Sequence, residues 1–250
     1  MLRGDTVLYV SAPDIRRAIE YDLEQEKKFD YTQLDIGRIV THIADFVSGL
    51  WQIHPFGEGN TRTTAVFAIQ YLRSMGFNVE NDLFAKHSWY FRNALVRANY
   101  QNIQKGIKRE PTYLELLFRN LLMGECHELK NRYMIINVPE NMAAPTPTST
   151  PTSTPTSSEA PWRIDNENVF RLVRAIAGDK LSVKEMMDAV GLKDRGNFME
   201  YSLNPAIQEG FVSMLYPDKP RHPRQKYLLT VKGTAMLGDL STETHVFDGR

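Results

Sequence analysis

The chain has 250 residues, of which 30 are Lys or Arg and 30 are Asp or Glu, so its formal net charge at pH 7 is zero. This balance excludes a general attraction to nucleic acid or to an anionic membrane, and any basic surface has to be local. The single cysteine, Cys126, excludes an internal disulfide framework and a thiolate metal cluster, and it fits a reducing compartment. Apolar runs stay well short of the roughly 20 residues that cross a bilayer, so we expect a soluble, cytoplasmic protein without membrane contact.

The first half of the chain is predicted to be mostly helical. Residues 6–11 are rich in β-branched and aromatic side chains and are expected to form a strand. Apolar residues then recur at spacings of three and four over 36–51, which predicts a long helix that runs up to His54. A second helix is expected directly after the following loop, and Gly76 suits a left-handed cap at its end. Further helical patterns span residues 83–101 and 112–134.

A low-complexity tract separates the two halves. Residues 143–160 repeat Pro, Thr and Ser and contain no side chain that could offset the entropy of ordering. Regular prolines would keep such a linker extended and semi-stiff. The boundaries that follow are a first domain at 1–140, a linker at 141–161, a second domain at 162–240 and a tail at 241–250.

The second domain has a different pattern. Helical segments are expected near residues 169–176, 183–190 and 197–208. Two strand-like runs follow at 211–216 and 225–230, with a proline-rich turn between them. Three helices and a hairpin predict a winged helix-turn-helix.

The loop between the first two long helices reads His-Pro-Phe-Gly-Glu-Gly-Asn-Thr-Arg over residues 54–62. Gly57 and Gly59 let the backbone turn tightly and approach a ligand closely, and Asn60 tolerates unusual dihedral angles. The amides of Gly59, Asn60 and Thr61 are expected to converge at the start of the second helix, where unpaired N–H groups and the helix dipole favour phosphate. The pattern therefore predicts an anion-binding loop.

Three ionisable side chains complete this loop. Glu58 can hold Mg²⁺, which binds through one or two carboxylates together with substrate phosphates. Arg62 presents a fork of donors for a second phosphate. His54 follows the buried face of the first helix and could remove a proton from an attacking hydroxyl, an effect worth roughly 10² to 10⁴ in rate. A histidine at a helix end is by itself usually structural, and a Gly-Glu-Gly loop is more often a turn, so the joint occurrence carries the prediction.

These residues resemble the motif of the Fic family, His-x-Phe-x-(Asp/Glu)-Gly-Asn-Gly-Arg-x-x-Arg, which lies between two helices. The second domain is similar to the winged-helix extension behind some bacterial Fic cores. The resemblance implies a mainly α fold, with an all-helical core, a short β-hairpin flap at residues 6–11 and a C-terminal winged helix-turn-helix domain. The motif positions matched in this chain are His54, Phe56, Glu58, Gly59, Asn60 and Arg62.

The resemblance also implies a function. The chain would be a protein adenylyltransferase, in which His54 activates a Ser, Thr or Tyr hydroxyl of a target protein and AMP is transferred from ATP with release of pyrophosphate. Glu58 would carry Mg²⁺, and the nucleotide would contact residues 59–62 together with Gly57. Phe91 and Asn99 look similar to the segment that meets the adenosine.

The chain departs from the family pattern in three places. Thr61 replaces the second glycine of the motif, which is tolerable if Thr61 begins the helix with ordinary dihedral angles. Ala65 stands where the second arginine is expected, so the preference for ATP and the usual inhibition by a glutamate are both in doubt. No (Ser/Thr)-x-x-x-Glu-(Gly/Asn) segment occurs. The flap-like strand begins almost at Met1, which is why a short form is expected.

A second class of function stays open. Residues 219–226 gather five basic or imidazole side chains, and Lys193, Arg195 and Asn197 would open a recognition helix, so the chain could be a nucleic-acid-binding regulator with a degenerate Fic core. Nearby acidic residues nearly cancel this charge, and a protein-interaction or dimerisation module is an equal alternative. A Fic-type enzyme that transfers another phosphate-containing group, or removes AMP, also remains open. The target protein, the oligomeric state and the completeness of the N-terminus are not determined by the sequence.

Overall fold

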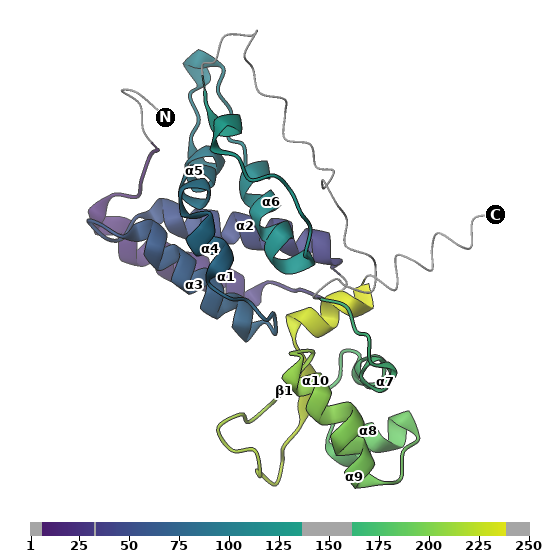
Figure 1. Cartoon of the computed structure of the whole chain (residues 1–250). Helices are drawn as coiled ribbons and strands as arrows, with labels where there is room; N and C mark the ends of the chain where they lie inside the picture. The colour runs from purple at the N-terminus through teal and green to yellow at the C-terminus, as the bar shows by residue number, and fades with distance from the viewer. Residues whose placement is uncertain (1–6, 33, 137–161, 239–250) are drawn as a thin grey trace, which may run out of the picture. The chain divides into compact units, whose positions relative to one another are not determined.

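The computed structural model describes residues 7–32, 34–136 and 162–238, and within them the fold is mainly helical with one small antiparallel hairpin, as predicted (Figure 1). The chain divides into two compact units. The first unit comprises Met1–Phe29, Val40–Gln70 and Glu80–Thr156, and the second comprises Asp30–Ile39, Tyr71–Val79 and Ser157–Arg250. The predicted linker at 141–161 and the predicted tail at 241–250 lie outside the described residues. No helix in the described ranges is both long enough and apolar enough to cross a bilayer.

Two helices flank the motif loop, as the apolar spacing predicts. The helix before the loop is α2 (Ile36–Ile53), and its apolar stripe is buried, with Ile39, Ile43 and Val47 at 0% exposure. The helix after the loop is α3 (Asn60–Ser74), which ends before Gly76 at φ 93°, the left-handed conformation expected there. The remaining helices of the first half are α4 (Asp82–Lys86), α5 (Ser88–Asn99) and α6 (Thr112–Met123), with short 3₁₀ turns η1 (Ala12–Asp14), η2 (Ile103–Lys105) and η3 (Asn131–Met134).

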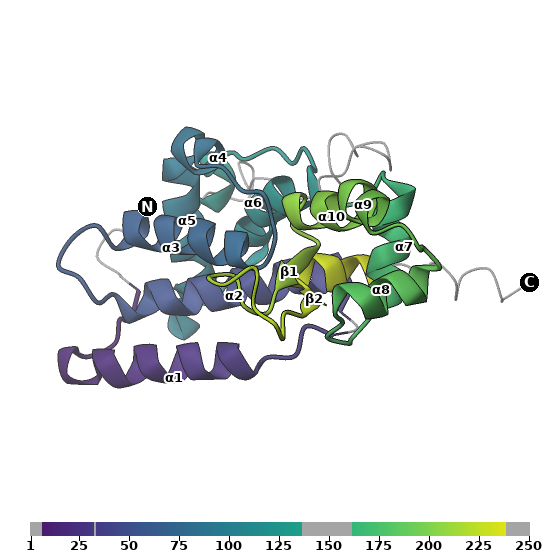
Figure 2. The same ribbon diagram turned by 90° about the horizontal axis from the view of Figure 1, so that it is seen from below.

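The first helix of the chain was not predicted. Helix α1 (Ile15–Lys28) lies along α2 and α3 with its axis roughly parallel to theirs (Figure 2). Glu26 is its buried residue, and it bonds to His42 of α2, with 2.7 Å between Oε2 and Nε2. Phe29, which follows the helix, stacks on the His42 ring at 3.4 Å. A polar contact therefore supports the docking of α1, which an apolar pattern cannot reveal.

Two predictions in this half were wrong. Residues 7–11 form no strand, because η1 begins at Ala12 with Pro13 in its first turn, and none of the described segments pairs with them. The helical pattern over 112–134 is interrupted, because Gly124 adopts φ 70° and caps α6. Thr6 lies outside the described residues.

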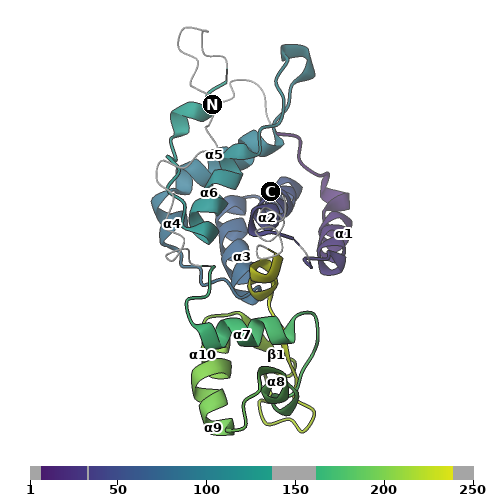
Figure 3. The ribbon, with the colours of Figure 1, turned by 90° about the vertical axis from the view of Figure 1, so that its right-hand side faces the viewer.

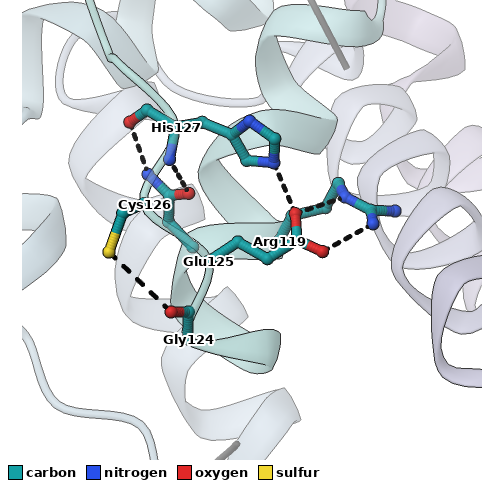
Figure 4. A network of polar contacts seen from close by, with 6 residues as sticks. Arg119, Gly124, Glu125, Cys126 and His127 are labelled. Atoms are coloured by element: carbon teal, nitrogen blue, oxygen red, sulfur yellow. Dashed lines mark hydrogen bonds and ion pairs between the residues drawn. The ribbon is translucent and has the colours of Figure 1, made fainter. Parts of the chain in front are cut away.

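A buried polar network fixes the chain after α6 (Figure 4). The Arg119 guanidinium donates two hydrogen bonds to the Glu125 carboxylate, at 2.7 and 2.6 Å, and the ring of His127 contacts the same carboxylate. The side chain of Asn120 bonds to both the amide and the carbonyl of His127, at 2.8 and 2.9 Å. Cys126 points away from this network and is exposed.

The C-terminal part has the predicted elements in the predicted order, and a further helix over residues 231–238 follows the hairpin (Figure 3). Ser182 and Glu185 form a capping box at the start of its second helix. Val169, Phe198 and Phe211 are among the residues of a separate apolar core. The elements are α7 (Glu167–Ile176), α8 (Val183–Val190), the continuous helical run α9 (Arg195–Phe198), η5 (Met199–Leu203) and α10 (Asn204–Gln208), and the antiparallel strands β1 (Val212–Met214) and β2 (Tyr227–Leu229), with Ser213 opposite Leu228.

Candidate active site

His54 is the first residue after α2 and has an unusual backbone. Its φ is 57°, a left-handed value that side chains other than glycine rarely adopt, and its amide donates to the Trp51 carbonyl at 3.2 Å. Strain of this kind persists only where the surroundings enforce it, and it is common at functional sites. The helix therefore ends abruptly at His54 and the chain turns into the motif loop.

Aromatic rings enclose the imidazole of His54. The ring of Tyr9 stacks on it with centroids 4.0 Å apart and planes at 29°, and the ring of Trp51 meets it edge-on at 6.0 Å. The buried Nδ1 atom of His54 has no hydrogen-bond partner in the described part of the chain. Burial lowers the pKa of His54 below the ordinary value of histidine, so the imidazole is neutral at neutral pH and can accept a proton.

Tyr9 reaches His54 because the N-terminal segment lies on the end of α2. The carbonyl of Leu8 accepts a hydrogen bond from Nε2 of Gln52 at 3.0 Å, and the Tyr9 ring also packs edge-on against Trp51 at 5.8 Å. Burial raises the pKa of Tyr9, and the nearby Arg92 guanidinium opposes that shift. Residues 7–9 therefore cover the histidine without forming the predicted strand.

The side chain of Asn60 closes the motif loop. Its Oδ1 accepts a hydrogen bond from the Phe56 amide at 3.0 Å, and its Nδ2 donates to the Phe56 carbonyl at 2.7 Å. Asn60 is 5% exposed, so this pair of bonds is sheltered from water. The side chain of Asn60 thus shapes the loop, while the predicted contact with nucleotide phosphate involves its backbone amide.

Thr61 connects the loop to the helix before it. Its Oγ1 accepts a hydrogen bond from Nε1 of Trp51 at 3.1 Å, and the residue lies within α3 rather than at positive φ. The replacement of the motif glycine by threonine therefore introduces no backbone strain.

The start of α3 has the features of an anion site. Gly59, at φ 78°, accepts the first helical hydrogen bond from the Thr63 amide at 2.9 Å. The amides of Asn60, Thr61 and Arg62 precede that bond, so the helix itself offers them no acceptor, and its dipole adds positive potential there. A Cβ on Gly59 would lie 3.8 Å from the Nη2 atom of Arg62, so the exposed guanidinium lies beside the same turn. Gly57 is exposed, and a Cβ there would meet nothing within 4 Å.

Glu58 is exposed on the loop, directly before the turn at Gly59. The described residues contain no group of three or more His, Cys, Asp or Glu side chains that could hold a metal ion. A single carboxylate beside helix-initial amides that have no helical acceptor fits Mg²⁺, which completes its shell with water and substrate phosphates. It does not fit a metal held by protein ligands alone.

Two predicted binding residues are buried in the core. Phe91 is 1% exposed and its ring packs edge-on against Phe84 at 5.0 Å. Asn99 is 5% exposed, and its Nδ2 donates to Oγ of Ser48 at 2.8 Å and to the Leu95 carbonyl at 2.9 Å. Both side chains hold α5 in place, and neither is brought together with His54. The residue that the sequence did not indicate is Tyr9, whose contact with His54 is too distant along the chain to leave a local pattern.

Comparison with known proteins agrees with the motif. Residues 5–72 match the model of the Fic/DOC family, and residues 167–230 match the C-terminal domain of the Fic-like proteins described as filamentation induced by cAMP. A search of curated proteins finds no match. A crystal structure of a Fic family protein from Desulfovibrio desulfuricans is 21% identical, and the match covers 89% of this chain and 57% of that chain with a TM-score of 0.32.

The first match spans α1, α2, the whole motif loop and most of α3, so these elements form a Fic/DOC domain. The second match covers α7 to β2, the C-terminal elements that share a separate apolar core. With both domains in this order, the chain belongs to the Fic family.

Proposed function

We propose that this protein is an adenylyltransferase that transfers AMP from ATP to a Ser, Thr or Tyr hydroxyl of a target protein, with His54 as the general base. Family membership supports a Fic-type transferase in general. AMP transfer with His54 as the base is supported by the position of its neutral imidazole, which is packed against two aromatic rings. The first amides of a 15-residue helix follow six residues later. A proton acceptor beside a phosphate-binding turn is the pairing that phosphoryl transfer to a hydroxyl needs.

The chemical step is a displacement at the α-phosphate. The target hydroxyl oxygen forms a bond to the α-phosphorus while the bond from that phosphorus to the bridging oxygen breaks, and pyrophosphate leaves. His54 takes the hydroxyl proton, which requires the neutral ring that burial favours. General-base assistance of this kind is worth roughly 10² to 10⁴ in rate.

The remaining residues bind the nucleotide. The amides of Asn60, Thr61 and Arg62 would hold the phosphates at the positive end of α3, and the Arg62 side chain would add a charged fork. Glu58 would carry Mg²⁺, which neutralises phosphate charge when bound. Ala65 is half-buried and brings no charge to the place where the family motif has its second arginine, so the terminal phosphate has one fewer contact.

The test is to incubate the full chain with Mg²⁺ and ATP labelled at the α- or the γ-phosphate, with and without a cell lysate, and to look for label on protein. The expected result is α-label on the chain itself or on a lysate protein, and its loss in His54→Ala. The matched control is His222→Ala, which removes a histidine from the second unit and should label as the original does.

Other outcomes would overturn parts of the proposal. Label from the γ-phosphate alone would mean transfer of a phosphoryl group instead of AMP. Unchanged labelling by His54→Ala would remove the general-base role. Absence of label with every nucleoside triphosphate, while ATP still binds, would indicate a degenerate core.

A further inference from the structure

The helical run from Arg195 to Gln208 presents a polar face that the transferase proposal does not use. Asn197, Tyr201, Asn204 and Gln208 are all exposed, and we call these four side chains the reading face. Between them, Phe198, Leu203 and Ala206 are fully buried in the C-terminal core. The run is therefore anchored on one side, and the opposite side offers three amides and one hydroxyl.

The composition of this face suits the edges of base pairs. Asn and Gln side chains make paired hydrogen bonds to the N6 and N7 positions of adenine in the major groove, which is wide enough to admit a helix. Glu200 is the acidic residue on this side of the run, and carboxylates accept from the amino group of cytosine. Two basic side chains, Lys193 and Arg195, are exposed at the start of the run, with Asp194 between them as its N-cap.

The loop between β1 and β2, residues 215–226, is ordered by its own contacts. The Gln225 side chain accepts from the Tyr216 amide at 3.0 Å and donates to the Tyr216 carbonyl at 2.9 Å, which clamps the base of the loop. The His222 ring packs on the Tyr216 ring at 4.2 Å, and its Nδ1 accepts from the Arg224 amide. These contacts fix the backbone of the loop, so the charged residues that it carries have defined positions before a partner binds.

The charge on this loop is mainly positive. Lys219, Arg221 and Arg224 are exposed, and Asp218 is the acidic residue in the loop. Lys226, which the sequence grouped with them, is half-buried and donates to the Lys180 carbonyl at 3.0 Å. Figures 1 and 3 show the loop and the N-terminal end of α9 at the same end of this part of the protein.

We propose that the C-terminal part binds duplex DNA, with the reading face in the major groove and the exposed Lys219, Arg221 and Arg224 on the phosphate backbone. The proposal is independent of nucleotide transfer at His54. Between residues 162 and 238 the sequence has twelve Lys or Arg and nine Asp or Glu, so attraction to phosphate depends on this local cluster. Base-edge contacts from the reading face would then select among sequences.

The experiment measures binding of the full chain to a fluorescent pool of random duplexes, about 25 base pairs long, over a series of salt concentrations. The expected result is binding at low salt that weakens steeply as salt rises, and enrichment of a short motif containing adenines after repeated selection. Unfolding midpoints of every variant are measured beside the binding, so that loss of fold is recognised.

Two sets of variants separate phosphate contacts from base contacts. The triple variant Lys219→Ala, Arg221→Ala, Arg224→Ala should weaken binding to every sequence and reduce the slope of log K against log salt by roughly 0.9 per lost phosphate contact. Asn204→Ala should leave binding to the random pool unchanged and reduce the preference for the enriched motif by about tenfold. The control is Arg171→Ala, Arg174→Ala on α7, which removes two exposed positive charges outside the cluster and should bind as the original does.

Three results would overturn the proposal. These are absence of binding at low salt, equal binding by the triple variant and its α7 control, and failure to enrich any motif. The first two would assign this surface to a protein partner or to solvent, and the third would remove the base-reading role of the reading face.

Discussion

The ring of Tyr9 lies on the imidazole of His54, with centroids 4.0 Å apart, and so covers the side chain that we assign as the general base. This contact joins residues 45 positions apart and keeps water from one face of the imidazole. Because the pKa of His54 is lowered by burial, Tyr9 contributes to keeping the base neutral.

Replacement of Tyr9 tests that contribution. In Tyr9→Ala the pKa of His54 should rise toward the ordinary value, because water returns to the ring, and the acid limb of the activity profile should move to higher pH. Tyr9→Phe keeps the stacked ring and should keep the lowered pKa. The pKa is followed by NMR titration of the imidazole signals, assigned with His54→Ala. An unchanged pKa in Tyr9→Ala would show that Trp51 and the backbone alone shield the ring.

The lowered pKa of His54 also has a consequence for folding. A histidine whose pKa is lower in the folded state than in the unfolded state destabilises the fold as pH falls through the unfolded value of about 6.5. His54→Phe removes this titration and should flatten the dependence of the unfolding midpoint on pH between about pH 7 and 5. Equal slopes for the two proteins, measured by thermal unfolding, would contradict the shift.

Asn60 can be tested for two roles separately. Asn60→Ala removes both hydrogen bonds to Phe56 and should lower the free energy of unfolding by about 1–2 kcal/mol. Asn60→Asp keeps the acceptor for the Phe56 amide, so its stability should lie closer to the original, while its negative charge should weaken ATP binding at the start of α3. Denaturant unfolding and calorimetric titration with ATP give the two quantities. Stability that is equal in all three proteins would mean that the loop does not depend on this side chain.

The network around Glu125 should matter in acid. Burial alone would raise the pKa of Glu125, but the hydrogen bonds from Arg119 and His127 outweigh it and hold the pKa below the ordinary value. The stability that it contributes is therefore present at neutral pH and is lost as pH falls through that lowered pKa. Glu125→Gln should cost about 3 kcal/mol at pH 7, since it leaves the Arg119 guanidinium without its carboxylate, and progressively less as pH falls through the lowered pKa of Glu125. The control is Glu128→Gln, which breaks an exposed pair with Lys130 and should leave the unfolding midpoint unchanged over the same pH range.

Restoring the second arginine of the motif tests the departure at position 65. Ala65→Arg should tighten binding of ATP by about tenfold over the original, because a charged hydrogen bond to a terminal phosphate is added, and should leave AMP binding unchanged. Ala65→Met adds similar bulk without charge and should change the binding of neither nucleotide. Equal gains for ATP and AMP would place the new side chain away from the terminal phosphate.

The elements that could be predicted are those whose signal is local. The stripe of α2, the left-handed end of α3 at Gly76 and the order of elements in the C-terminal part all follow from spacing and from cap residues. Helix α1 was missed because charged residues dominate it, and its half-buried apolar residues Ile15, Ile19 and Leu23, although they recur at helical spacing, did not stand out among them. The end of α6 had a local signal, Gly124, which the surrounding apolar pattern obscured.

The loop shows the same division. Its residue types indicate phosphate chemistry. Thr61 lies within α3, as expected for a β-branched residue that needs ordinary helical dihedral angles. Two contacts could not be predicted, namely the hydrogen bonds between Asn60 and Phe56 and the stacking of the Tyr9 ring on His54. Both depend on how backbone atoms and rings meet in space. Phe91 and Asn99 were assigned by resemblance alone, and in the fold their side chains pack and bond within the core.

The two hydrogen bonds between Asn60 and Phe56 form a closed ring within the loop, and no ligand is needed to complete it. The conformational entropy of these residues is therefore lost during folding and not when a phosphate arrives. An incoming anion has only water to displace from the first amides of α3. The loop should accordingly bind phosphate groups at a rate set by diffusion and charge, without a slow rearrangement of its own.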